Sequence, residues 1–187
     1  MIRPRALALL VLCGLVGSAC GGSDDPSPPG ARTSETGTRV TDGVVDVLVP
    51  EGWVSKEADV GLILAGDRKN LRSAAPTGPR MSLCFAVPDR YDPEQLLDAL
   101  AAEEVAVEGE SEPVTVDGRA GLAIETRRVR DGVAVSARVI VVTLDSGKVC
   151  TLFTEAPADQ FESHRATFDE IVESVRFVAS SPTPAPS

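Results

Sequence analysis

Three closely spaced turns in the second half of the chain constrain its fold more than any other feature. The turns are Asp117-Gly118, Arg130-Asp131-Gly132 and Asp145-Ser146-Gly147. Glycine suits such turns because it adopts the positive φ angles that tight hairpins require. The pattern predicts antiparallel hairpins with strands over residues 113–116, 120–129, 133–144 and 148–155.

The first half of the chain adds three expected strands, over residues 45–49, 61–65 and 80–87. The first of them ends at a turn that Pro50 and Gly52 form. A long loop over residues 66–79 separates the second from the third. In the third strand every second residue is apolar, which predicts one buried face. That face carries Met81, Leu83, Phe85 and Val87.

Two amphipathic helices are predicted. The first begins at Asp92-Pro93, because an aspartate side chain caps free amides and proline suits the first helical position, and it runs to Glu103. Its buried stripe is Leu96, Leu97 and Leu100. The second, over residues 157–175, places Phe161, Phe168, Ile171, Val172 and Val175 on one face. An antiparallel sheet flanked by helices is an α+β architecture.

The N-terminus has the order of regions that marks a secretory signal. Arg3 and Arg5 precede an apolar run over residues 6–16, and small residues follow at 17–19. The run is shorter than the roughly 20 residues that a membrane-spanning helix needs. We therefore expect residues 1–19 to be a signal peptide that is removed on export.

Cys20 follows directly on that signal. Gly17-Ser18-Ala19-Cys20 resembles the lipobox of bacterial lipoproteins, which implies that Cys20 is acylated and becomes the new N-terminus. Gly17 and Ala19 equally satisfy ordinary signal peptidase, so cleavage without lipid attachment stays open. The polar residues that follow predict a lipidated cysteine and disordered tether over 20–42, a single domain over 43–178 and a disordered Pro/Ser tail over 179–187.

The charge of the mature chain excludes two classes of partner. Of 18 lysines and arginines, two lie in the signal, which leaves 16 against 28 acidic residues and a net charge of about −12. This charge argues against nucleic acid and against electrostatic adhesion to an anionic membrane, so attachment falls to the lipid. Scarce lysine with abundant Arg, Ala, Gly and Val indicates a GC-rich genome, such as that of an actinobacterium. The expected location is the outer face of the cell membrane.

Cys84 and Cys150 remain once Cys13 is lost with the signal and Cys20 is acylated. Each lies in a predicted strand, and an oxidising compartment favours a disulfide between them. By the chain-entropy model, closing a loop of this length stabilises the fold by roughly 4 kcal/mol. The bridge requires that the two strands be neighbours. Two buried free thiols are the alternative.

Nothing in the sequence predicts catalysis, a metal or a cofactor. No Gly-x-Ser-x-Gly elbow or glycine-rich phosphate loop is present, and the only histidine, His164, falls at the edge of the last helix. An acidic run lacks the spacing of a calcium loop and is interpreted as a solvated face. The run comprises Glu103, Glu104, Glu108, Glu110 and Glu112.

Two basic groups are candidates for contact with an anionic partner. Arg68, Lys69 and Arg72 lie in the long loop. The second group lies on one hairpin, where cross-strand pairing with Glu125 and Asp131 is a simpler explanation. It comprises Arg127, Arg128, Arg130 and Arg138, of which Arg127 and Arg138 are the partner candidates.

The layout also resembles the PsbP-like fold and, within it, the actinobacterial LpqN-type lipoproteins. The segments that carry the resemblance are Val49-Pro50-Glu51-Gly52-Trp53, Asp92-Pro93, Val116-Asp117-Gly118-Arg119-Ala120 and Ser174-Val175-Arg176-Phe177. The resemblance implies an α/β/α sandwich that serves as a non-catalytic accessory or binding module. The photosynthetic relatives support a membrane complex, and LpqN-type lipoproteins are associated with envelope proteins and glycolipid traffic. The Cys84 and Cys150 pair lends this resemblance no support.

These observations favour a membrane-anchored lipoprotein that binds an envelope protein or lipid without doing chemistry. The alternative is a secreted hydrolase with an unrecognised carboxylate-based site. Two carboxylates that face each other in a deep cleft would favour that alternative.

Overall fold

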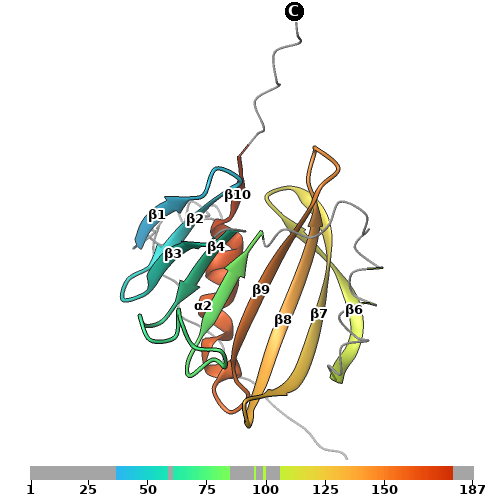
Figure 1. Ribbon diagram of the computed structural model, residues 1–187. Helices are drawn as coiled ribbons and strands as arrows, with labels where there is room; N and C mark the ends of the chain where they lie inside the picture. Colours follow the sequence, from blue (N-terminus) through green and yellow to red (C-terminus); the bar gives the residue numbers. More distant parts are fainter. Residues whose placement is uncertain (1–36, 59–60, 85–94, 96–98, 100–105, 179–187) are drawn as a thin grey trace, which may run out of the picture. The chain divides into compact units, whose positions relative to one another are not determined.

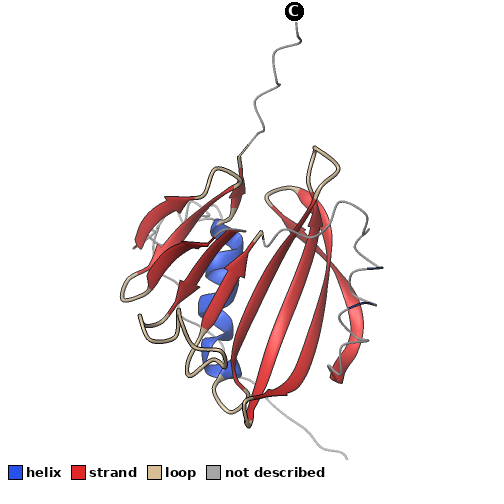
Figure 2. Ribbon diagram, in the orientation of Figure 1, coloured by secondary structure: helices blue, strands red, loops and turns tan. Residues whose placement is uncertain are grey.

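The computed structural model describes residues 37–58, 61–84, 95, 99 and 106–178, which form two antiparallel sheets and a long helix (Figures 1 and 2). The elements are β1 (Gly37–Thr41), β2 (Val45–Pro50), β3 (Val54–Ala58), β4 (Gly61–Ala65), β5 (Arg80–Leu83), β6 (Ala106–Val116), β7 (Arg119–Arg130), β8 (Val133–Thr143), β9 (Val149–Pro157), α2 (Phe161–Ser174) and β10 (Arg176–Phe177).

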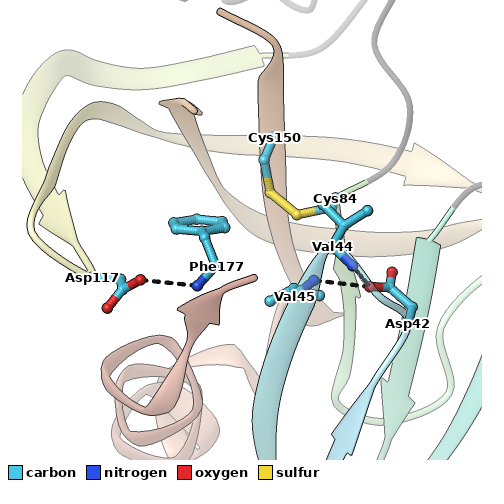
Figure 3. The surroundings of a disulfide bond; sticks show 7 residues. All are labelled: Asp42, Val44, Val45, Cys84, Asp117, Cys150 and Phe177. Atoms are coloured by element: carbon cyan, nitrogen blue, oxygen red, sulfur yellow. Dashed lines mark hydrogen bonds between the residues drawn. A yellow bond between two sulfur atoms is a disulfide. The ribbon is translucent and has the colours of Figure 1, made fainter. Parts of the chain in front are cut away.

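The smaller sheet has the strand order β1-β2-β10. Alternation along β2 buries Val45, Val47 and Val49. The turn from β1 into β2 is fixed by Asp42, whose carboxylate accepts hydrogen bonds from the backbone amides of Val44 and Val45 (Figure 3). At the other end of β2, the amide of Trp53 donates to the carbonyl of Pro50, which closes the turn into β3.

The larger sheet has the strand order β3-β4-β5-β9-β8-β7-β6. Its hairpins from β6 to β9 lie where the sequence predicted them, although β6 begins at Ala106 and is longer than expected. Asp117 and Gly118, like Asp131 and Gly132, adopt the positive φ angles that these turns require. β5 pairs with β9, so a strand from the first half of the chain joins the hairpins of the second half (Figure 1).

The helix α2 packs on both β2 and β9 and completes the main core. Its buried residues include Phe161, Phe168 and Ile171, at the helical spacing that the sequence predicted. The main core combines β2, β4, β5 and the α2-facing side of β7, β8 and β9. A second apolar cluster of Ile124, Val139 and Val141 lies on the opposite side of the same sheet.

Several predictions on the fold need correction. The tether expected over residues 20–42 ends earlier, because β1 occupies Gly37–Thr41 and pairs with β2. β3 and β10 were not predicted, and the strands form two sheets rather than one. The α+β class holds for the described residues. Helices on both sides of the sheet are only partly supported, because α2 is the one helix whose bounds the described residues give.

Other predictions fall outside the described residues. At the ends of the chain they are the signal peptide over 1–19, Cys20 with most of the tether, and the tail over 179–187. In the middle they are Phe85, Val87 and most of the helix over 92–103. Gln95 and Ala99 are the described residues of that helix, and both are helical. Within the residues that the structure does describe, no helix is long and apolar enough to cross a membrane.

Candidate binding groove

A disulfide joins the two cysteines that the sequence singled out. Cys84 follows β5 and Cys150 lies in β9, with their Sγ atoms 2.08 Å apart and their Cα atoms 4.4 Å apart (Figure 3). The two strands are paired, as the bridge requires. The amide of Cys84 also donates a hydrogen bond of 2.8 Å to the carbonyl of Thr151. The disulfide therefore connects the end of β5 to β9.

A groove of about 1390 Å³ opens where the two sheets meet. Its walls are β1, the end of β2, the first residues of β3, and the loop over residues 68–73. Trp53 and Leu71 give it apolar surface. The Trp53 ring packs edge-on against Phe168 of α2 at 6.1 Å between ring centroids, so this side chain connects the groove to the core.

The groove is basic. Lys56 from β3 joins Arg68, Lys69 and Arg72 from the loop, whereas Glu51 is the only acidic residue among the described residues that line it. Within the described part of the chain, none of these four basic side chains forms an ion pair. Their charges face solvent without a carboxylate partner, which leaves them available to an anionic ligand.

The loop that carries these charges is built around one buried side chain. Asn70 is 0% exposed, and its amide nitrogen donates to the carbonyls of Gly78 at 2.8 Å and Pro79 at 2.9 Å. Its side-chain oxygen accepts the amide of Thr77, and its backbone amide donates to the carboxylate of Asp67. Asn70 thus holds both ends of the loop together.

A second set of contacts fixes the loop to the large sheet. Glu155 of β9, only 3% exposed, accepts hydrogen bonds from Arg80, whose Nε lies 2.8 Å away. The other end of the Arg80 guanidinium donates to the carbonyls of Asn70 and Ser73 in the loop.

Two hairpin arginines complete this cluster. Arg128 lies 3.1 Å and Arg130 lies 3.6 Å from the Glu155 carboxylate, and Arg130 also donates to the carbonyl of Ala74. Burial lowers the pKa of Arg130, while the charge of Glu155 acts in the opposite direction. Arg130 therefore contacts the loop directly, and Arg128 is linked to it through the Glu155 carboxylate.

The remaining hairpin arginines lie on the other side of the sheet, because alternate residues of a strand point to opposite faces. Arg127 pairs with Glu108 at 3.3 Å. Arg138 pairs with Glu112 at 2.5 Å and with Asp169 of α2 at 3.3 Å.

The partners that the sequence suggested for this hairpin, Glu125 and Asp131, are therefore not those found for Arg127 and Arg138. Glu125 instead pairs with Arg165 of α2 at 2.6 Å. The structure brings Arg68, Lys69 and Arg72 together in the groove and engages Arg127 and Arg138 elsewhere in ion pairs.

The other sequence candidates form no site among the described residues. His164 lies on α2 with its ring 6.4 Å from that of Phe168. Glu108, Glu110 and Glu112 are exposed along β6, while Glu103 and Glu104 lie outside the described residues. No cluster of potential metal ligands occurs in the part of the chain that the structure describes.

The comparisons with known proteins identify the fold. No family model and no curated protein matches the sequence. Among solved structures, LpqN from Mycobacterium tuberculosis, described as involved in cell envelope biogenesis, is 16% identical with a TM-score of 0.53 over 76% of this chain and 90% of LpqN. Cyanobacterial PsbP from Synechocystis is 15% identical with a TM-score of 0.50 over 81% of this chain and 98% of that one. A protein from Bacteroides thetaiotaomicron is 12% identical with a TM-score of 0.51 over 81% of this chain and 52% of its own. The chain has a PsbP-like fold, which it shares with LpqN.

Proposed function

We propose that this PsbP-like chain is a membrane-anchored extracytoplasmic lipoprotein and that its basic groove binds an anionic envelope partner, protein or lipid, without catalysis. The signal over residues 1–19 and the lipobox at Cys20 support export and anchoring. The Cys84–Cys150 disulfide suits an oxidising compartment outside the cytoplasm. The fold shared with LpqN, a protein involved in cell envelope biogenesis, is consistent with this location.

The observation that carries the proposal is the group of cations that line the groove with Trp53 and have no ion-pair partner among the described residues. The mature chain has a net charge of about −12, yet Lys56, Arg68, Lys69 and Arg72 line the groove with Glu51 as the only described acidic residue there. A concave surface lined by one sign of charge concentrates ligands of the opposite sign. Trp53 adds a large apolar surface with a polar N–H, a combination common at binding sites.

The same composition makes the groove a poor candidate for the hydrolase alternative. Carboxylate-based hydrolysis needs an acid and a base on two side chains that flank the scissile bond. Glu51 is the only carboxylate among the described residues that line this groove. The groove therefore favours binding over chemistry.

Photo-crosslinking in cells tests the proposal at the groove itself. Thr38 of β1 lines the groove and is exposed, so Thr38 is replaced by the photoreactive amino acid p-benzoylphenylalanine. Val129, 74% exposed at the tip of the β7–β8 hairpin, receives the same replacement as a matched control. Irradiation is expected to yield a discrete adduct at position 38 that disappears when Arg68, Lys69 and Arg72 are all changed to Ala. The proposal fails if position 38 gives no adduct, or if the adduct survives loss of the three charges.

Anchoring is tested separately at Cys20. The Cys20→Ser variant is expected to lose labelling by a fatty-acid analogue and to leave the membrane fraction. A Ser18→Ala variant keeps the small-residue rule of the cleavage region and is expected to retain both label and location. Membrane attachment of Cys20→Ser at the level of the unmodified chain would contradict the lipid anchor.

A further inference from the structure

We propose that the partner enters the groove as an extended acidic peptide segment that adds to the free edge of β3 as an extra strand. This inference rests on the proposed function and names the kind of partner that the groove accepts. β3 is the terminal strand of the seven-stranded sheet, and β4 is its only pairing partner among the described strands (Figure 1). An unpaired strand edge offers backbone N–H and C=O groups as a template for an incoming strand.

The groove runs along the edge of β3 rather than over one of its faces. Val54, Ser55 and Lys56 are consecutive, and all three line the groove. Successive side chains of a strand point to opposite faces of the sheet. Three consecutive lining residues are therefore best explained by a groove that follows the side of the strand, where the backbone is accessible.

The opposite wall of the groove is formed by β1. From β1, Gly37, Thr38 and Val40 line the groove, and the side chains of Thr38 and Val40 share one face of the strand. Their cross-strand partners are Val49 and Val47, which point into the core. A strand beside β3 would therefore occupy the groove that Thr38 and Val40 also line.

The charges of the groove favour acidic side chains on the added strand. Lys56 lies on β3 itself, and Arg68, Lys69 and Arg72 lie on the loop that borders the groove. Arginine binds carboxylates in a bidentate geometry, which suits glutamate and aspartate side chains. A basic or neutral segment would leave these cations without counter-charge.

The packing of the domain favours a peptide over an acyl chain. A lipid tail needs an enclosed apolar chamber, whereas this groove lies open at the surface. The space between α2 and β8 that Phe161 and Phe168 border measures only about 10 Å³, the size of a single water molecule at most. Neither of these two pockets is a chamber that would shield a lipid tail from water.

The test uses the secreted chain with Cys20→Ser, which lacks the acyl group. The probe is a capped peptide that alternates glutamate with valine and is long enough to pair with the five residues of β3. One control peptide carries lysine in place of glutamate, and another has N-methyl groups on alternate amides, which keeps the charge but blocks strand pairing.

Vesicles of phosphatidylglycerol and phosphatidylcholine test a lipid surface. Trp53 fluorescence reports binding, because it is the only tryptophan in the chain, and amide hydrogen exchange locates it.

The acidic peptide is expected to shift Trp53 emission and to slow exchange of the β3 amides, while both control peptides fail. Changing Arg68, Lys69 and Arg72 to Ala should weaken binding by about tenfold or more, and added salt should weaken it further. The inference is overturned if the N-methylated peptide binds as well as the parent, if exchange of β3 is unchanged, or if only the vesicles shift Trp53 emission. The crosslinking experiment separates this inference from the proposed function. If position 38 gives its adduct in cells but one of these three peptide results is obtained, strand addition is wrong and the proposed function still stands.

Discussion

Basic residues gather in two regions of this domain, the loop over residues 68–73 and the β7–β8 hairpin, and the two groups have different surroundings. On the hairpin, Arg127, Arg128, Arg130 and Arg138 each lie within ion-pair distance of a carboxylate. In the loop, Arg68, Lys69 and Arg72 have no such partner among the described residues. Similar charge runs in the sequence are thus paired with carboxylates in one place and lack such partners among the described residues in the other.

The difference follows from where each group lies. The hairpin is flanked by β9 and faced by α2, which bring Glu155 and Asp169 within reach of its arginines. The loop leaves the sheet between β4 and β5, and Glu51 is the only described carboxylate that lines its groove. Substitutions in the two regions should therefore have opposite signatures, with loss of stability on the hairpin and loss of binding in the loop.

Removal of Glu155 should produce the largest effect on stability. Glu155→Ala is expected to lower the free energy of unfolding by about 3 to 5 kcal/mol, because three guanidinium groups lose the one carboxylate that they share. Urea denaturation measures the change. Glu51→Ala in the groove is the control and should stay within about 0.5 kcal/mol of the original chain. A loss below about 1 kcal/mol for Glu155→Ala would show that solvent already screens the cluster.

Asn70→Ala should have the next largest effect. The variant leaves the Thr77 amide and the carbonyls of Gly78 and Pro79 without their side-chain partner, at a cost of about 2 kcal/mol. Because Asn70 shapes the loop, we also expect weaker binding of the acidic peptide although no charge is lost. Thr77→Ala, which keeps the backbone amide, is the matched control. Unaltered thermal stability of Asn70→Ala would contradict the role assigned to this side chain.

Arg138→Ala sharpens the comparison between paired and unpaired arginines. Loss of its contacts with Glu112 and Asp169 should cost about 1 kcal/mol, since partly exposed ion pairs contribute modestly. Arg72→Ala, which breaks no ion pair in the described structure, should change stability by less than about 0.5 kcal/mol. Equal effects of the two substitutions in urea denaturation would remove the distinction between the two regions.

The smallest effect concerns acid titration on α2. Hydrogen bonds from Arg165 lower the pKa of Glu162 below its ordinary value. The contribution of this pair is therefore present above the unfolded-state pKa and is lost as the pH falls through the lower folded-state pKa. In Arg165→Ala, the pKa of Glu162 should return to its ordinary value, as a carbon-detected NMR titration would show. An identical titration curve in both chains would contradict the hydrogen-bonded pair.

The sequence predicts the elements that alternation and tight turns define, and it misses those whose partners are distant. The hairpins, β2, β4 and α2 follow from local patterns of valine, glycine and helical spacing. β1 and β3 were not predicted because each is a terminal strand of its sheet and is mostly exposed, so neither shows clear alternation. The split into two sheets likewise depends on contacts that no local pattern reveals.

The candidate site was predicted in part for the same reason. Arg68, Lys69 and Arg72 are visible as a basic run in the sequence, and the structure places them in the groove. Lys56 and the wall formed by β1 were missed together with their strands. The roles of Asn70 and Glu155 depend on the loop closing on itself and on β5 pairing with β9. A buried asparagine between prolines and glycines in a long loop is the only local signal, and it is weak.

The position of β9 in the sheet has a consequence for the order in which the protein can assemble. β5 lies between β4 and β9, yet Cys84 and Cys150, which connect β5 to β9, are 66 residues apart. A chain made from its N-terminus therefore presents β1 to β5 long before their neighbours β9, α2 and β10 exist. The walls of the groove reach their final positions only when nearly the whole chain is available. An incomplete copy of the chain, released early during synthesis, would consequently lack the assembled groove.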